Sequence, residues 1–235
     1  RFADYRFVWA LKEPRTFDSP RTRSVKYLSL SYFFWLARSK YWISNCKLPS
    51  YILKKKDQVY LQTWHGTSLK RLAHDIQISS DAKFYRSGLN AQEMQSTYDD
   101  DVKKYTYMIA PNSFCTRVFQ SAFGIEKERL IETGYPRNDI LINADEQKKQ
   151  EIRARLGIPE GKKVLLYAPT WRDNSFVAAG YTFELQADFR KWKEMLADEY
   201  VLLFKPHYLI INKFSETEEL NGFLYNVDAS SEISD

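Results

Sequence analysis

Two of the three histidines of this sequence directly follow apolar segments that have the composition of buried strands. The first is His65, in the segment Gln-Thr-Trp-His-Gly-Thr (Gln62–Thr67), at the end of the predicted strand Val59–Trp64. Ligands of open parallel sheets bind beyond the carboxyl ends of the strands, and imidazole readily takes a proton from a hydroxyl near neutral pH. His65 is therefore a candidate general base. A structural histidine at a turn explains this single motif equally well.

The residues after His65 suit an approaching anion. Gly66 permits a sharp turn of the backbone or a close approach to a ligand. Thr67 or Ser68 would cap the segment Leu69–Ala73 and leave backbone amides directed at a phosphate.

The C-terminal part of the sequence repeats this arrangement in Phe-Lys-Pro-His (Phe204–His207). Pro206 ends the preceding apolar strand because it lacks a backbone donor, so His207 emerges beside Lys205 at the carboxyl end. Such a pair of cationic or hydrogen-bonding side chains suits a diphosphate.

A third strand, Val164–Ala168, leads into Ala-Pro-Thr-Trp-Arg-Asp (Ala168–Asp173). Arg172 offers a planar guanidinium for phosphate oxygens, and Thr170 offers a hydroxyl. The alternative for Arg172 is a salt bridge to Asp173 or Asp188. Three strand ends that each deliver a histidine or an arginine favour a common site.

Gly-Tyr-Pro-Arg-Asn-Asp (Gly134–Asp139) adds Arg137 near a predicted hinge, from where it would reach phosphate. Helix capping or bracing of the hinge is an equally good explanation for Asn138 and Asp139. His74 follows no predicted strand, and we expect it to be a surface or packing residue.

No metal and no cofactor are expected. The sequence lacks a glycine-rich dinucleotide motif, a phosphate loop and any metal-ligand spacing of His, Cys and acidic residues. Cys46 and Cys115 are too few for a disulfide framework or a zinc site. The acidic run Asp99–Asp101 lies in a polar helical stretch, which predicts a solvated face.

Apolar runs alternate with amphipathic segments along the chain, which predicts an α/β fold with parallel sheets covered on both faces. Ser113 and Asp145 are candidate N-caps, and Gly124 and Gly157 stand where helices should end. The predicted strands are Tyr5–Leu11, Tyr41–Asn45, Val59–Trp64, Tyr107–Ala110, Val164–Ala168 and Val201–Phe204. The predicted helices are Leu28–Ser39, Asn90–Tyr105, Ser113–Phe123, Asp145–Leu156 and Asp188–Ala197.

A turn-rich segment followed by a charged helix predicts a domain boundary, with one domain at 1–143 and a second, nucleotide-binding type at 144–235. Only about 75 residues follow Gly161, too few for a complete Rossmann-like half. We therefore expect the second domain to be incomplete and the chain to be part of a longer protein.

The net charge of +5 is unevenly distributed, because residues 1–60 carry 13 Lys and Arg against 4 Asp and Glu. This basic, aromatic-rich quarter suits a phosphate polymer, an anionic lipid or a nucleic acid, or is simply a solvated face. The apolar run Leu28–Ile43 is interrupted by Arg38 and Lys40, so it would lie in a membrane surface rather than cross one. The cysteine content favours a cytoplasmic protein.

Four motifs together resemble the CDP-glycerol glycerophosphotransferase family, whose members make bacterial teichoic acids and related capsule polymers. Two further stretches, Asp4–Lys12 and Lys40–Asn45, are similar as well, so the resemblance spans essentially the whole chain. The four motifs are Trp64–Lys70, Gly134–Asp139, Tyr167–Asp173 and Phe204–His207.

The resemblance implies a GT-B-type enzyme with two Rossmann-like domains and a cleft between them. The acceptor polymer would lie across the first domain, and the CDP-polyol would bind mainly to the second. His65 matches the proposed catalytic base, and His207 matches a catalytic histidine that binds the donor phosphate. The other candidate residues for the donor or its phosphates are Arg172, Thr170, Lys205, Arg137, Gly66 and Thr67. An Asp-Tyr-Ser-Ser-type donor segment of the family does not occur before Asp235, so we expect this chain alone to bind the donor poorly or not at all.

The expected reaction is transfer of glycerol phosphate or ribitol phosphate to the terminal hydroxyl of a teichoic-acid or capsule polymer, with release of CMP. The expected partners are a lipid-linked acceptor and the cytoplasmic face of the cell membrane, on which the protein would be peripheral, and no nucleic acid. Two alternatives stay open: a GT-B glycosyltransferase or epimerase that uses a UDP-sugar, and a non-catalytic basic module that binds membranes or polyanions. The motifs also leave open which polyol is transferred, and whether one unit or many are added.

Overall fold

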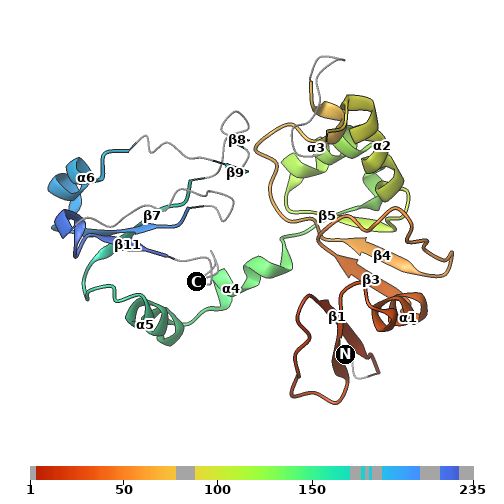
Figure 1. The fold of residues 1–235 in the computed structure, drawn as a ribbon, viewed down its shortest axis with the longest axis horizontal. Coiled ribbons are helices and arrows are strands. Elements are labelled where there is room, and N and C mark those ends of the chain that lie inside the picture. The colour runs from red at the N-terminus through yellow and green to blue at the C-terminus, as the bar shows by residue number, and fades with distance from the viewer. Residues whose placement is uncertain are drawn as a thin grey trace. The chain divides into compact units, whose positions relative to one another are not determined.

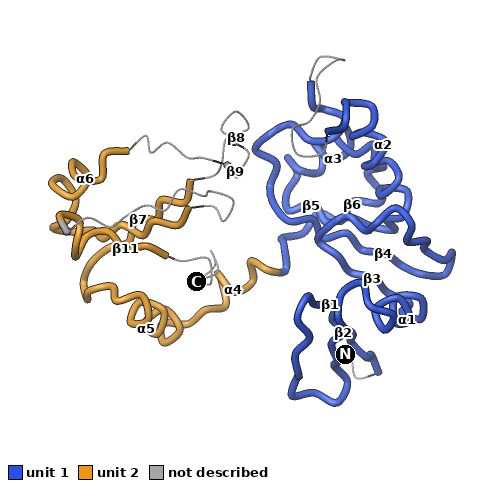
Figure 2. The backbone as a smooth tube through the Cα atoms, viewed as in Figure 1, with its two compact units in different colours: residues 1–136 blue, residues 137–235 orange. Residues whose placement is uncertain are grey.

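The chain folds into two compact units, residues 1–136 and residues 137–235 (Figure 2). The computed structural model describes residues 4–77, 88–169, 176–177, 180–181, 187–206 and 218–227. The division falls a little before the predicted boundary at 143/144, so the short helix α4 (Asp139–Asn143) belongs to the second unit.

The first unit is built on a four-stranded parallel sheet with the strand order β3-β4-β5-β6. The register places Trp42 opposite Tyr60 and Ile109 opposite Ile131. Met108, Ile109 and Ala110 are all buried, as expected for an apolar central strand of a parallel sheet. The strands are β3 (Tyr41–Ser44), β4 (Val59–Gln62), β5 (Tyr107–Ala110) and β6 (Leu130–Glu132).

Helices α2 (Ala91–Val102) and α3 (Ser113–Phe123) pack beside each other next to β5 (Figure 1). A capping box between Asn90 and Glu93 starts α2. The N-cap of α3 is Asn112, whose side chain accepts a hydrogen bond from the Cys115 amide, so the prediction of Ser113 was one residue late. Gly124 ends α3 with φ 58°, a conformation that glycine adopts without strain.

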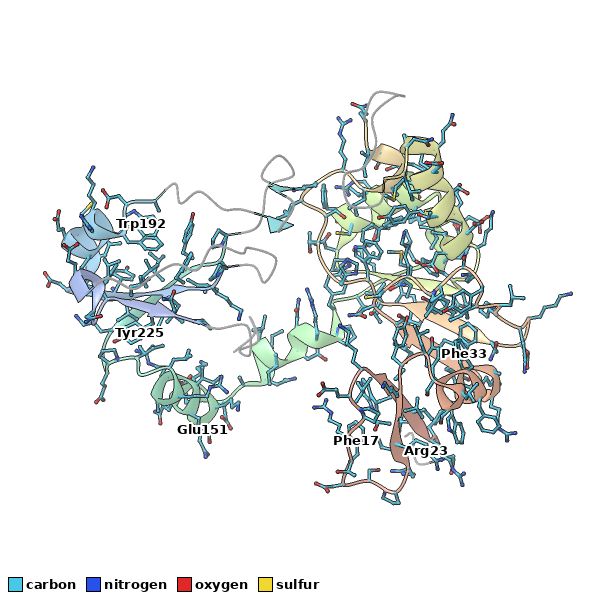
Figure 3. The ribbon with its side chains drawn as sticks, in the orientation of Figure 1. Phe17, Arg23, Phe33, Glu151, Trp192 and Tyr225 are labelled. Carbon is cyan, nitrogen blue, oxygen red and sulfur yellow. The ribbon has the colours of Figure 1, made fainter. Side chains whose placement is uncertain are left out.

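An additional parallel pair precedes the main sheet, formed by β1 (Phe7–Leu11) and β2 (Thr22–Lys26). No helix connects these strands, so one face of β1 stays open and Trp9 is 54% exposed. The prediction of sheets covered on both faces was wrong here. The Arg23 guanidinium of β2 lies 4.6 Å from the ring of Trp35 in α1 (Leu30–Arg38), and this contact joins the pair to the helix (Figure 3).

The second unit contains a three-stranded parallel sheet with the order β11-β10-β7. Its strands are β7 (Lys163–Tyr167), β10 (Tyr200–Phe204) and β11 (Leu224–Asn226). Phe189 of α6 (Phe189–Leu196) packs on Phe204, and Trp192 of the same helix (Figure 3) packs on Tyr167. Helix α5 (Glu146–Arg155) begins at the predicted N-cap Asp145, which accepts a hydrogen bond from the Lys148 amide. A short antiparallel pair, β8 (Phe176–Val177) and β9 (Gly180–Tyr181), completes the described strands.

Asp101 is buried, with 3% of its surface exposed, so the predicted solvated face of Asp99–Asp101 was wrong at this position. Its carboxylate accepts hydrogen bonds from the Tyr105 hydroxyl and, at 3.2 Å, from the Leu48 amide. Burial is the largest influence on this carboxyl and raises its pKa, and the two hydrogen bonds partly offset that effect. Asp101 faces the core because α2 turns it toward the loop that follows β3.

We predict that Asp101→Ala lowers the free energy of unfolding by about 2–4 kcal/mol, because the Tyr105 hydroxyl and the Leu48 amide lose their acceptors inside the protein. The neighbouring Asp100 is the matched control, since its partner is the exposed side chain of Lys103. Asp100→Ala should change the stability by no more than about 0.5 kcal/mol. Urea unfolding of both variants measures the difference. Equal decreases in the free energy of unfolding would show that the buried hydrogen bonds of Asp101 do not stabilise the fold more than the surface pair of Asp100.

Candidate active site at the carboxyl ends of the first sheet

The carboxyl ends of the four strands β3 to β6 meet at one edge of the main sheet of the first unit, because these strands are all parallel. Backbone hydrogen bonds continue past the strands at this edge. The Thr63 amide donates to the Ser44 carbonyl at 2.8 Å, and the Thr133 amide donates to the Ala110 carbonyl at 2.9 Å. The segment after β4 is thereby held against the end of β3, and the segment after β6 against the end of β5, at the edge where a ligand of such a sheet would bind.

His65 lies in this edge, exposed, three residues beyond the end of β4. Its Nδ1 is 2.7 Å from the carbonyl oxygen of Asn45, the residue that directly follows β3. A carbonyl only accepts hydrogen bonds, so Nδ1 carries the proton and the neutral ring keeps its free lone pair on Nε2. A general base needs this arrangement, in which one nitrogen is fixed by the protein and the other is open to a substrate hydroxyl.

Trp64 makes the turn that presents His65. Its φ is 56°, in the left-handed region, which costs a residue other than glycine about 1–3 kcal/mol. The indole is buried and packs edge-on against Phe123 of α3, with ring centroids 4.9 Å apart. The His65 ring also stacks on the indole, with ring centroids 4.3 Å apart. Burial of the indole holds the strained backbone and gives the imidazole a flat surface to lie on.

The backbone bends at His65 and Gly66, as the sequence allows, although the positive φ of this loop belongs to Trp64 and Gly66 has none. Its carbonyl accepts a hydrogen bond from the Tyr135 hydroxyl at 2.8 Å, which links the His65 loop to the motif after β6. A Cβ atom built on Gly66 would meet no atom within 4 Å, so this side of the loop is open. The expectation that Gly66 permits a close approach stays a prediction.

The predicted capped segment Leu69–Ala73 is not helical. The next helical turn is η1 (Ala73–Asp75), and no side chain caps it. A short helix depends on packing to offset the cost of starting it, and Leu69, which is 93% exposed, supplies none. Thr67 and Ser68 therefore direct no helical amides at a phosphate. The Ser68 hydroxyl is buried beside this loop and has no hydrogen-bond partner within the described residues.

Of the candidates in the second unit, Lys205 directly follows β10, as predicted, and its amide donates to the Tyr167 carbonyl at 3.0 Å. Arg137 is exposed and lies in the short helical turn η3 (Pro136–Asn138). The prediction that His74 is a surface residue is confirmed: its Nε2 is 2.7 Å from an Asp99 carboxylate oxygen. Three predicted site residues lie outside the described residues, namely Thr170, Arg172 and His207.

Sequence reasoning missed three residues that shape this site. Asn45 acts through its carbonyl, Tyr135 through its hydroxyl, and Gln62 through a buried amide at the end of β4. A glutamine inside an otherwise apolar strand was the available signal for Gln62. Nothing in the composition of the segment after β3 marks the Asn45 carbonyl, because every residue carries that group.

The candidate site is thus a histidine with one fixed ring nitrogen at the strand ends of a parallel α/β fold, and comparisons with known proteins show the family to which such a chain belongs. The family model described as CDP-Glycerol:Poly(glycerophosphate) glycerophosphotransferase matches residues 1–235. The chain belongs to this family.

Relatives with established names support this assignment. The teichoic acid poly(glycerol phosphate) polymerase of Staphylococcus epidermidis is 39% identical over 226 residues, which are 94% of this chain and 30% of that protein. The polymerase of the same name from Bacillus spizizenii is 36% identical and aligns with 98% of this chain and 58% of its own length. A solved structure of the wall teichoic acid polymerase TagF superposes with a TM-score of 0.84 at 36% identity, covering 99% of this chain and 56% of that one. The chain thus spans between about a third and three fifths of these relatives.

Proposed function

We propose that this protein transfers glycerol phosphate from CDP-glycerol to the terminal hydroxyl of a teichoic-acid polymer and releases CMP. The observation that carries the proposal is the hydrogen bond from His65 Nδ1 to the Asn45 carbonyl, which leaves Nε2 free at the strand ends. The full-length family match and the glycerol-phosphate polymerases among the relatives support the choice of donor.

In this mechanism His65 Nε2 accepts the proton of the acceptor hydroxyl while the hydroxyl oxygen attacks the phosphorus that bears glycerol. The bond from that phosphorus to the bridging oxygen breaks, and its electron pair leaves with CMP. Phosphoryl transfer depends on positioning and on stabilising charge at the phosphate oxygens. We assign the second task to the cationic side chains Arg172, His207 and Lys205, with Arg137 and the hydroxyl of Thr170 as further contacts.

In this proposal, the two units correspond to the two Rossmann-like domains of a GT-B-type enzyme. The first unit would take the acceptor, because it carries His65, and the second would bind the CDP moiety beyond the carboxyl ends of β7 and β10. Gly66 and Thr67 would contact the transferred phosphate, since both lie in the His65 loop.

CMP release from CDP-glycerol tests this function directly. The full-length protein should release CMP from CDP-glycerol in the presence of a glycerol-phosphate-primed acceptor, and at least tenfold more slowly from CDP-ribitol. A UDP-sugar should give no UMP or UDP. Turnover of the UDP-sugar instead would favour a glycosyltransferase, and binding of polyanions without any turnover would favour the non-catalytic module.

His65→Ala should reduce transfer by about 10²–10⁴-fold, the usual cost of losing a general base, while thermal unfolding and CDP-glycerol binding stay nearly unchanged. His74→Ala is the matched control, because His74 is also exposed but pairs with Asp99 on the surface. Steady-state rates of CMP release for the two variants measure the effect. A His65→Ala enzyme within a few-fold of wild type would remove His65 from the catalytic role.

A peripheral association with the cytoplasmic face of the membrane is the further part of this proposal. None of the helices in the described part of the chain is long and apolar enough to cross a membrane. Helix α1 and the segment after β3 nevertheless expose large apolar side chains, with Leu30 at 90%, Leu53 at 85% and Phe34 at 54%. Arg38 and Lys40 line an adjoining hollow of about 340 Å³. Apolar side chains beside cations suit an anionic lipid surface, where a lipid-linked acceptor would be presented.

Not every lysine of this surface is free to bind lipid. The Lys54 ammonium donates to the Gln58 carbonyl at 2.9 Å, and the Lys55 ammonium donates to the Ala37 carbonyl at 2.9 Å. Lys55 therefore holds the turn before β4 against the end of α1, and Lys54 closes that turn on itself. A test of membrane binding should leave them in place.

Replacing Arg38, Lys40 and Lys56 by Gln should weaken co-sedimentation with anionic vesicles at least tenfold, because each cation near such a bilayer contributes about 1 kcal/mol. The control replaces Lys103, Lys148 and Lys149 by Gln, which removes the same charge from exposed helix positions elsewhere. Equal binding of the two variants, or no binding by wild type at low salt, would assign the basic surface to the acceptor polymer.

A further inference from the structure

Gln62 ends β4 with a fully buried side chain and uses both ends of its amide. Its Oε1 accepts a hydrogen bond from the Trp64 amide at 2.9 Å. Its Nε2 donates to the Cys46 carbonyl at 3.1 Å and lies 3.2 Å from the Tyr60 hydroxyl and 3.4 Å from the Tyr105 hydroxyl. A buried amide with partners on every side specifies one local arrangement of the chain.

Gln62 bonds the backbone of Cys46 and of Trp64, and each of these residues is adjacent in sequence to a residue at the imidazole contact, Asn45 or His65. Cys46 follows Asn45, whose carbonyl receives the Nδ1 proton. Trp64 precedes His65 and carries the left-handed backbone conformation. Gln62 thus ties the loop after β3 to the loop after β4 at the point where the imidazole bridges them. A leucine fills similar space but makes neither bond, and an ionised glutamate can accept from Trp64 but cannot donate to Cys46.

The hydrogen bonds of Gln62 continue through Tyr105 to Asp101, which holds the loop after β3 at a second residue, Leu48. The Tyr105 hydroxyl donates to the Asp101 carboxylate, and the same carboxylate accepts from the Leu48 amide. Burial raises the pKa of Tyr60 and of Tyr105, so both phenols keep their protons and accept from the amide as neutral groups. Cys46 and Leu48 are therefore both held, and the Asn45 carbonyl beside them has little freedom to move.

We propose that Gln62 is a positioning residue for His65: it holds the Asn45 carbonyl and the Trp64 backbone so that the neutral imidazole carries its proton on Nδ1 and offers Nε2 to the acceptor. The inference rests on the proposed function of His65 as the general base. Gln62 itself touches neither substrate nor reacting atoms, since its side chain is fully buried.

The chain offers a matched control at the other end of the same strand. Gln58 is also buried, and its amide makes the same kinds of bond: Oε1 accepts from the Lys55 amide at 2.9 Å, and Nε2 donates to the Ser39 carbonyl at 2.7 Å. It precedes β4, whereas His65 follows it. Gln58→Leu and Gln62→Leu should therefore lower the melting temperature by similar amounts, but only Gln62→Leu should disturb His65.

In the full-length protein, we expect Gln62→Leu to lower kcat for CMP release by about 10–100-fold with an unchanged KM for CDP-glycerol, as a misplaced catalytic group does. Gln58→Leu should stay within about threefold of wild type in kcat, because its bonds do not reach the His65 loop. Equal losses of kcat in the two variants would overturn the proposal, because they would reduce the role of Gln62 to general stability.

A second readout does not depend on activity. Nitrogen-15 NMR of the histidine side chains, assigned with His65→Ala, reports which ring nitrogen is protonated in the neutral form. Wild type and Gln58→Leu should show the Nδ1–H form of His65, and Gln62→Leu a mixture of both forms. An unchanged His65 tautomer in Gln62→Leu overturns the inference. If Gln62→Leu does not fold, Gln62→Glu is measured instead, since it keeps the acceptor for Trp64 and removes the donor to Cys46.

The two proposals fail in different ways. Full activity of His65→Ala would refute the role of His65 as base, whatever the tautomer shows. An inactive His65→Ala together with an unchanged kcat and tautomer in Gln62→Leu would leave the base in place and refute the positioning role of Gln62.

Discussion

The parallel pairing of β3 with β4, in the register that sets Ser44 opposite Gln62, is the constraint on which the rest of the site depends. This register continues into the Thr63–Ser44 backbone hydrogen bond and brings the Asn45 carbonyl next to the His65 ring. A slip of one residue would turn every side chain of β4 to the opposite face and send the Gln62 amide out of the core. The pairing of β3 with β4 thus fixes the distance between the Asn45 carbonyl and the His65 backbone, and the neighbouring side chains then orient the imidazole ring.

Aromatic packing then holds a backbone conformation that the chain would not adopt alone. Trp64 has a positive φ, and its indole lies among Phe119 and Phe123 on one helix. Complete burial of a large apolar side chain contributes about 1.5–3 kcal/mol, similar in size to the cost of the left-handed residue. The strain is therefore stored in the residue before His65, and the packing of the indole on α3 supports it.

The excess of positive charge in the first quarter of the chain serves two purposes that composition cannot separate. Arg23 lies over the ring of Trp35, and Lys54 and Lys55 bind backbone carbonyls, so these cations hold parts of the first unit together. Arg38 and Lys40 lie over the exposed rings of Phe34 and Tyr41, at 5.5 and 5.8 Å, and also line an open hollow. In an enzyme whose proposed donor and acceptor are both phosphate esters, such remaining cations are the ones available to attract substrate or an anionic surface.

The sequence by itself determined the alternation of strands and helices, the parallel sheets, and the positions of His65 and Lys205 just past strand ends, because apolar runs and the residues that end them act locally. It missed β2, β6, β8, β9 and β11, whose short segments become strands only when a neighbour offers hydrogen bonds. It also missed the burial of Asp101, the turn at Trp64 and the Asn45 carbonyl that orients His65. Those features join residues 20 or 53 positions apart, and only the tertiary structure decides which distant groups meet, because the register of the strands sets their contacts.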